Sequence, residues 1–161
     1  MCGAIQGGAR FGMNVANGSV PQRSSAELGA KEELRMQAGD VSDEGIFGWE
    51  LVLDLYECDQ SIITSRKGLL EFVKGICREL DLRPYAEPWA QRFGFSRGRT
   101  AGYTVVQLME VSSVVGHFSE QSGSAYLNIF SCKPFDRTAI AEYCKDYLGS
   151  GRVQERFLVR R

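Results

Sequence analysis

The chain contains a single histidine, His117, among its 161 residues. Histidine is the side chain whose ordinary pKa puts a charge change near neutral pH, so His117 is the only imidazole available for acid–base chemistry there. Ser112 and Ser113 precede it by five and four residues, and Cys132 follows it by fifteen. A hydroxyl, an imidazole and a thiol at these intervals could supply a nucleophile, a base and an acid. The alternative is structural, because most lone histidines serve no reaction.

Paired cysteines, long apolar runs and an excess of either charge are also missing. The cysteines, with no Cys-x-x-Cys pair among them, predict neither a zinc site nor a disulfide framework, so we expect no metal and a reducing cytoplasm. No apolar run approaches the roughly 18 residues that span a bilayer, and the N-terminus lacks signal-peptide features, which predicts no membrane association. A net charge of −1 argues against a nucleic-acid partner.

The composition changes after residue 45. Residues 1–45 are rich in Gly, Ser, Ala and charge and show no sustained periodicity, which predicts a flexible N-terminal extension. Residues 46–161 have the aromatic residues and the apolar periodicity of one folded domain.

Hydrophobic periodicity then predicts five strands and two helices in the order β-α-β-β-β-α-β. The predicted strands are Trp49–Tyr56, Trp89–Phe95, Tyr103–Val111, Ser124–Ser131 and Arg152–Arg161, and the predicted helices are Ser65–Leu80 and Asp136–Leu148. Asp136 is expected to cap the second helix and Gly149 to end it. This order predicts an α/β (α+β) two-layer sandwich, a mainly antiparallel sheet with two helices packed on one face.

Arginine recurs along the last predicted strand, at Arg152, Arg156 and Arg160, opposite Val153 and Phe157. This spacing is compatible with an anion site, but a solvated strand face is the favoured interpretation.

Several motifs resemble the bacterial and archaeal S-adenosylmethionine decarboxylases, small proenzymes that cleave themselves to make a pyruvoyl cofactor. Tyr56-Glu57-Cys58-Asp59 is similar to the turn that ends the family's first strand. The stretch Gly102–Ser112 is similar to the family's Gly-x-Ser/Thr strand, which leads to the processing serine. The intervals from Ser112 to His117, and on to Phe130-Ser131-Cys132, also match. The resemblance covers residues 48–161.

This resemblance implies a pyruvoyl-dependent carboxy-lyase that acts on S-adenosylmethionine in spermidine biosynthesis. The chain is expected to cleave itself between Val111 and Ser112, with Thr104 donating a hydrogen bond to the oxyanion and His117 acting as base. Ser112 then becomes the pyruvoyl group, which forms a Schiff base with the substrate's amine. Cys132 protonates the resulting carbanion. Assembly as a homodimer of processed protomers is also implied.

Three further residues concern substrate binding. Phe93 matches a family aromatic residue that stacks on adenine, and a core position is the alternative. The family's Thr-Trp-Pro-Glu motif after the histidine, whose glutamate is implicated in holding ribose, is here Phe118-Ser119-Glu120-Gln121. Glu120 or Gln121 is therefore the candidate for ribose binding.

The cleavage motif also departs from the family's Glu-Ser-His, because the chain has Val111-Ser112-Ser113 there. Three alternatives therefore remain open: an uncleaved, inactive homologue that serves as a binding or regulatory subunit, a pyruvoyl enzyme acting on arginine or ornithine, and another reaction of S-adenosylmethionine. In the simplest structural interpretation, Ser112 and Ser113 are edge-strand residues, His117 lies in a turn, and Cys132 is a small buried side chain.

Overall fold

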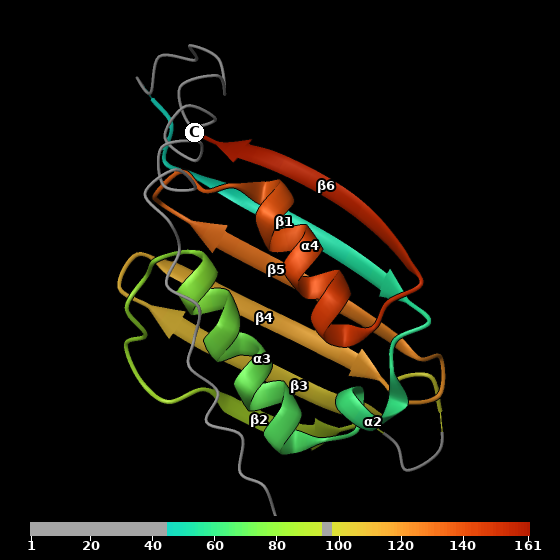
Figure 1. Cartoon of the computed structure of the whole chain (residues 1–161). Coiled ribbons are helices and arrows are strands. Elements are labelled where there is room, and N and C mark those ends of the chain that lie inside the picture. The colour runs from blue at the N-terminus through green and yellow to red at the C-terminus, as the bar shows by residue number, and fades with distance from the viewer. Residues whose placement is uncertain (1–44, 95–97) are drawn as a thin grey trace, which may run out of the picture. The chain divides into compact units, whose positions relative to one another are not determined.

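The computed structural model describes residues 45–94 and 98–161, which form six strands and three helices in this part of the chain (Figure 1). The strands are β1 (Gly48–Tyr56), β2 (Trp89–Phe93), β3 (Gly102–Met109), β4 (Ser112–Ser119), β5 (Ser124–Ser131) and β6 (Arg152–Arg160), and the helices are α2 (Gln60–Ile63), α3 (Arg66–Glu79) and α4 (Arg137–Leu148). The predicted extension, residues 1–45, lies outside the described residues except for Gly45.

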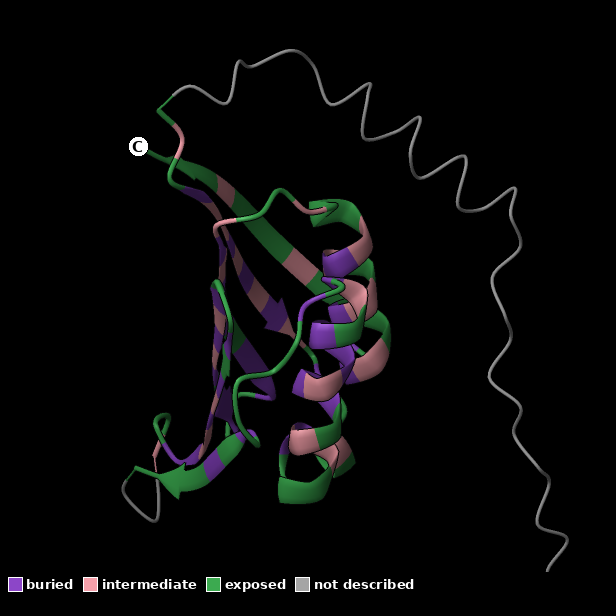
Figure 2. Cartoon of the chain, turned by 90° about the vertical axis from the view of Figure 1, so that its left-hand side faces the viewer, coloured by how far each residue is buried: buried purple, intermediate pink, exposed green. Residues whose placement is uncertain are grey.

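All six strands pair in one sheet in the order β2-β3-β4-β5-β1-β6, and every neighbouring pair is antiparallel (Figure 1). Helices α3 and α4 lie side by side on one face of this sheet. The predicted two-layer α+β architecture is therefore confirmed. The other face of the sheet, which we call the open face, carries no helix from the described part of the chain (Figure 2).

The core lies between the helices and the sheet, where Figure 2 shows the buried residues concentrated. Alternate residues of β1, β4 and β5 point into it, as expected for a sheet with one covered face. Phe72 of α3 is the largest fully buried side chain, and its ring contacts Phe118 of β4 and Tyr143 of α4.

Helix boundaries follow the capping residues that the sequence supplies. The Asp136 side chain accepts hydrogen bonds from the backbone N–H groups of Thr138 and Ala139, and Ser65 does the same for Gly68 at the start of α3. Gly149 ends α4 in the left-handed conformation, with φ of 61°. The predicted starts and ends of both long helices are thus confirmed to within a residue.

Close helix packing depends on a small residue in α3. A Cβ atom at Gly75 would overlap the Tyr143 hydroxyl of α4. With glycine there, the Tyr143 hydroxyl donates a hydrogen bond to the carbonyl oxygen of Phe72 at 3.0 Å, and Tyr147 does the same to Gly68. These two bonds join the helices along their length.

The middle of the sheet differs from the prediction. The strand predicted to run through Val111 ends at Met109, and a sixth strand, β4, begins at Ser112 after a two-residue turn. The turn residues, Glu110 and Val111, are not typical of tight turns, so composition did not mark a break there. The helical turn α2 was also missed, and β2 ends at Phe93.

Candidate active site

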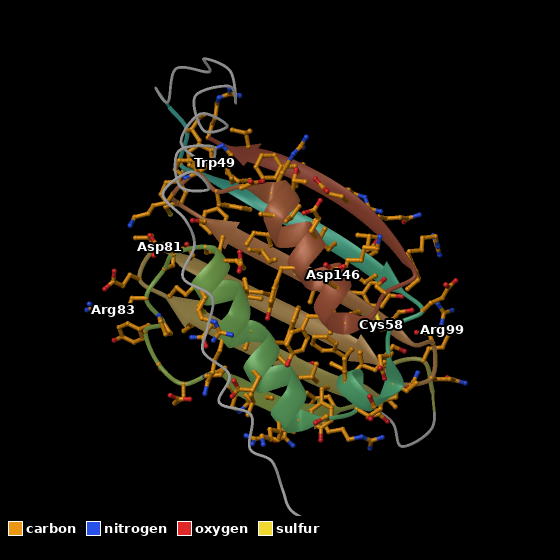
Figure 3. The ribbon with its side chains drawn as sticks, viewed as in Figure 1. Trp49, Cys58, Asp81, Arg83, Arg99 and Asp146 are labelled. Carbon is orange, nitrogen blue, oxygen red and sulfur yellow. The ribbon has the colours of Figure 1, made fainter. Side chains whose placement is uncertain are left out.

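The predicted cleavage point lies in the tight turn between β3 and β4. Met109 and Ser112 are paired across the hairpin, so Glu110 and Val111 alone form its turn. The Glu110 N–H donates to the Arg83 carbonyl at 3.4 Å. Figure 3 shows Arg83 near the end of the sheet where α3 terminates, whereas Cys58 and Arg99 lie at the opposite end. The Val111–Ser112 bond therefore lies at one end of the sheet.

The Ser112 side chain is buried on the helix-covered side, with 8% of the residue exposed. Ser112 is paired with Ser131 of β5, and its hydroxyl donates a hydrogen bond to the Ser131 hydroxyl at 2.8 Å. The Val111 carbonyl oxygen accepts a hydrogen bond of 3.0 Å from the backbone N–H of Cys132. We call these four residues, Val111, Ser112, Ser131 and Cys132, the hairpin cluster.

The imidazole lies on the open face instead. His117 faces Thr104 across the β3–β4 ladder, and the Thr104 hydroxyl is 3.0 Å from His117 Nδ1. His117 is exposed and Thr104 partly buried. A hydroxyl that bonds Nδ1 holds the imidazole in one orientation, and the other ring nitrogen, Nε2, then points away from Thr104. The alternative that placed His117 in a turn is therefore wrong, because the residue lies within a strand.

The two groups are well separated within one chain. Ser112 and His117 are five residues apart on the same strand, which at roughly 3.3 Å per residue places their Cα atoms about 16 Å apart. An odd spacing also puts the two side chains on opposite faces of the sheet. One protomer therefore places Ser112 beside Ser131, and Thr104 beside His117, but does not bring these two pairs together.

Aromatic side chains lie beside the Thr104–His117 pair. Phe93 is 49% exposed, so the core position is excluded, and its ring lies 5.6 Å from that of Trp89 along β2. Phe93 pairs with Gly102, two residues from Thr104 on β3. The structure thus leaves the Phe93 ring available to a planar ligand.

Glu120 already has a strong partner. Its carboxylate accepts hydrogen bonds of 2.9 and 2.6 Å from the Arg92 guanidinium, a bidentate pair that holds the Glu120 pKa below its ordinary value. The pKa of Arg92 is raised by the same contact. Gln121, the neighbouring candidate, is exposed. The ion pair leaves Gln121 the more accessible of the two for a ligand hydroxyl.

The arginines of β6 are engaged by acidic and aromatic residues of β1. Arg156 bonds Asp54 at 3.1 Å, Arg160 bonds Glu50, and the Arg152 guanidinium lies 3.8 Å from the Tyr56 ring centroid. These contacts on the open face agree with the interpretation of a strand face rather than an anion site.

The cysteines fall into two environments among the described residues. Cys58, Cys77 and Cys144 are buried, and desolvation raises their pKa values, that of Cys58 to about 11. Cys132 is only partly buried, in the hairpin cluster. It is therefore the described thiol best placed for chemistry.

No group of three or more His, Cys, Asp or Glu side chains in residues 45–94 and 98–161 could hold a metal ion. Within the same ranges no helix has the length and apolar character needed to cross a membrane.

The sequence did not indicate two functional groups of the hairpin cluster, the Ser131 hydroxyl and the backbone N–H of Cys132. Ser131 was noted only as part of Phe130-Ser131-Cys132, and the Cys132 backbone N–H carries no signal in a sequence. The one clue to Ser131 in the sequence is its position next to the candidate thiol of Cys132.

Comparison with known proteins gives a consistent result. The family model of S-adenosylmethionine decarboxylase matches residues 49–161. The S-adenosylmethionine decarboxylase proenzymes of Clostridium botulinum strains Langeland and Hall are each 25% identical over 114 residues, covering 70% of this chain and 93% of the relative. The crystal structure of the adenosylmethionine decarboxylase from Aquifex aeolicus superposes with a TM-score of 0.61 at 21% identity. That match covers 71% of this chain and 91% of the other, and supports the fold.

The fold and the hairpin cluster define a small α+β protein with a buried serine directly after a hairpin turn at one end of an antiparallel sheet. The chain belongs to the S-adenosylmethionine decarboxylase family, whose curated relatives are decarboxylase proenzymes.

Proposed function

We propose that this protein is a pyruvoyl-dependent S-adenosylmethionine decarboxylase of spermidine biosynthesis, cytoplasmic and activated by self-cleavage between Val111 and Ser112. The observation that carries the proposal is the hairpin cluster, where the Ser112 hydroxyl is buried and directed while the Val111 carbonyl is bound by the Cys132 N–H. The resemblance to the proenzymes of Clostridium botulinum supports the substrate.

Self-cleavage begins with an acyl shift. The Ser112 Oγ attacks the Val111 carbonyl carbon, the C–N bond breaks, and the hydroxyl proton ends on the Ser112 nitrogen, leaving an ester. Negative charge develops on the Val111 oxygen during this step, where the Cys132 N–H is already a donor. The oxyanion role that the resemblance gives Thr104 stays a prediction, since Thr104 bonds His117 in the uncleaved chain.

Elimination follows. A base removes the Ser112 Cα proton, and the ester leaves as the Val111 carboxylate. The dehydroalanine that remains takes up water and loses ammonia, which gives the pyruvoyl group at the new terminus. His117 is the base that we assign, because no other imidazole exists in the chain. The Val111 side chain takes no part in these steps, so the departure from glutamate does not prevent cleavage.

The pyruvoyl group would supply the carbonyl that binds the substrate's amine and the electron sink for decarboxylation. The residues near residue 112 fit that group, because the partly buried Cys132 thiol follows the paired Ser131 directly and can protonate the substrate carbon. Phe93 stacks on the adenine ring in this proposal, and Gln121 binds the ribose.

The separation of His117 from Ser112 points to a site completed by a second copy. Within one chain, His117 cannot take a proton directly from Ser112, because their Cα atoms are about 16 Å apart and their side chains lie on opposite faces of the sheet. The open face carries His117 together with exposed apolar side chains, among them Trp89, Leu108 and Leu158. We therefore propose a homodimer in which the open faces meet and each protomer's His117 reaches the Cα proton of the other's Ser112 from the open face, opposite to the Ser112 hydroxyl.

Carbon dioxide release tests the activity. The purified chain is incubated with carboxyl-labelled S-adenosylmethionine, arginine or ornithine, and the Ser112→Ala variant serves as the control. We expect label release from S-adenosylmethionine alone and none from the variant. Release from arginine or ornithine instead would refute the substrate assignment. No release from any substrate, together with an uncleaved chain, would favour the binding or regulatory subunit.

A further inference from the structure

The Ser131 side chain has no role in the chemistry described above, yet it touches the proposed nucleophile. We propose that Ser131 is the positioning residue for self-cleavage, holding the Ser112 hydroxyl for attack on the Val111 carbonyl. This inference rests on the proposed self-cleavage and adds a residue to it.

Burial and strand pairing place the Ser131 hydroxyl against the Ser112 hydroxyl. The two residues are directly paired across β4 and β5, and both side chains lie on the helix-covered side. Ser131 is 0% exposed, so bulk water cannot replace its hydroxyl. A buried hydroxyl without a partner is costly, which favours the conformation with the 2.8 Å bond between the two Oγ atoms.

The Ser131 hydroxyl is itself held in place. Its oxygen accepts a second hydrogen bond, from the Lys133 backbone N–H at 3.0 Å. A hydroxyl oxygen has two acceptor positions, so the bonds from Ser112 and Lys133 use both. The Lys133 bond fixes the Ser131 rotamer, and the fixed oxygen then restricts the rotation of the Ser112 hydroxyl.

The same strand end also holds the electrophile. Cys132, the next residue along the chain, donates its N–H to the Val111 carbonyl oxygen at 3.0 Å. Consecutive residues thus bind the attacking hydroxyl and the carbonyl that it attacks. Restricting both reacting groups before reaction lowers the entropic part of the barrier, and a single such contact is worth about tenfold or more in rate.

Loss of Ser131 and loss of His117 should block different steps of self-cleavage. Ser131 acts on the acyl shift, in which the Oγ–C bond forms and the C–N bond breaks. His117, in contrast, acts on the later elimination. Without Ser131 the chain should stay an amide, and without His117 it should accumulate the ester. Hydroxylamine cleaves esters readily and ordinary amides hardly at all, so it distinguishes these two states.

The experiment follows cleavage of freshly translated full-length chains by intact mass, with and without hydroxylamine. The variants are Ser131→Ala, Ser131→Cys, which keeps the side-chain volume but is a weaker acceptor, and Ser131→Thr, which keeps the hydroxyl. Ser124→Ala is the matched control, because Ser124 is a buried serine at the other end of β5. Thermal unfolding checks that each variant is folded.

We expect Ser131→Ala and Ser131→Cys to cleave about tenfold more slowly or worse, without rescue by hydroxylamine, while Ser131→Thr and Ser124→Ala keep the parent rate. His117→Ala should be cleaved by hydroxylamine. Parent rates in folded Ser131→Ala and Ser131→Cys would overturn the role of Ser131 and leave self-cleavage standing. A parent chain that never cleaves would overturn both.

Discussion

Complementation between two inactive variants tests the proposal that each site is shared by two protomers. His117→Ala keeps Ser112 but loses the base, and Ser112→Ala keeps the base but has no hydroxyl to process. Within one chain the two residues are about 16 Å apart, whereas proton transfer needs contact at about 3 Å. Neither variant alone should form the two pyruvoyl-type fragments.

Co-expression changes this outcome if the site spans the dimer. In a mixed dimer, the Ser112→Ala chain supplies His117 to the intact Ser112 of its partner. With equal expression and random pairing, roughly half of the His117→Ala chains should meet such a partner and be processed. Intact mass distinguishes the chains, since the substitutions differ in mass. A mixture in which the His117→Ala chains remain as unprocessed as when expressed alone would refute the shared site.

Three further predictions concern the fold and its charges. Phe72→Ala, which empties the centre of the core, should lower the free energy of unfolding by about 3–5 kcal/mol in urea titration; a loss below about 1 kcal/mol would contradict the packing described. Arg92 lowers the Glu120 pKa, so the stability contributed by this ion pair is present above the carboxyl's ordinary pKa of 4.5 and is lost as the pH falls through the lowered pKa. Glu120→Gln should therefore unfold more easily than the parent near pH 7, and the two stabilities should converge in acid. A difference in stability that stays constant with pH would be contrary evidence. Brief iodoacetamide treatment of the folded chain should label Cys132 well before Cys58, as mapped by peptide mass, and equal labelling would conflict with their burial.

The fold could be predicted where periodicity and capping residues agree. The apolar stripe of α4 between Asp136 and Gly149 defines a helix by its spacing and by both its ends. The strand β1 shows leucine at alternate positions facing the core. These local patterns were enough for the two-layer architecture.

Strand β4 was missed because its sequence shows only a weak alternation of apolar and polar residues. Serines stand at both ends and Gly116 in the middle, so the inward alternation is carried by few large side chains. The turn before it contains Glu110 and Val111, which extended the predicted strand of β3 to Val111 and left no visible break before β4. Tertiary pairing on both sides stabilises β4 despite this weak local signal.

The candidate site was predictable only in part. Intervals in the sequence placed Ser112, His117 and Cys132 together as a set, but an interval does not say which face of a sheet each side chain occupies. The strand register decides that, and it separates His117 from Ser112. The Ser131 hydroxyl and the Cys132 amide became visible only when β5 was placed against β4.

The intact mass of the purified chain tests the central claim most directly. Self-cleavage predicts two fragments, residues 1–111 and 112–161, with the second lighter by one ammonia than the product of plain hydrolysis and blocked to Edman sequencing. The Ser112→Ala variant should give one full-length species. A single full-length mass for the parent chain, unchanged after prolonged incubation, would contradict the account.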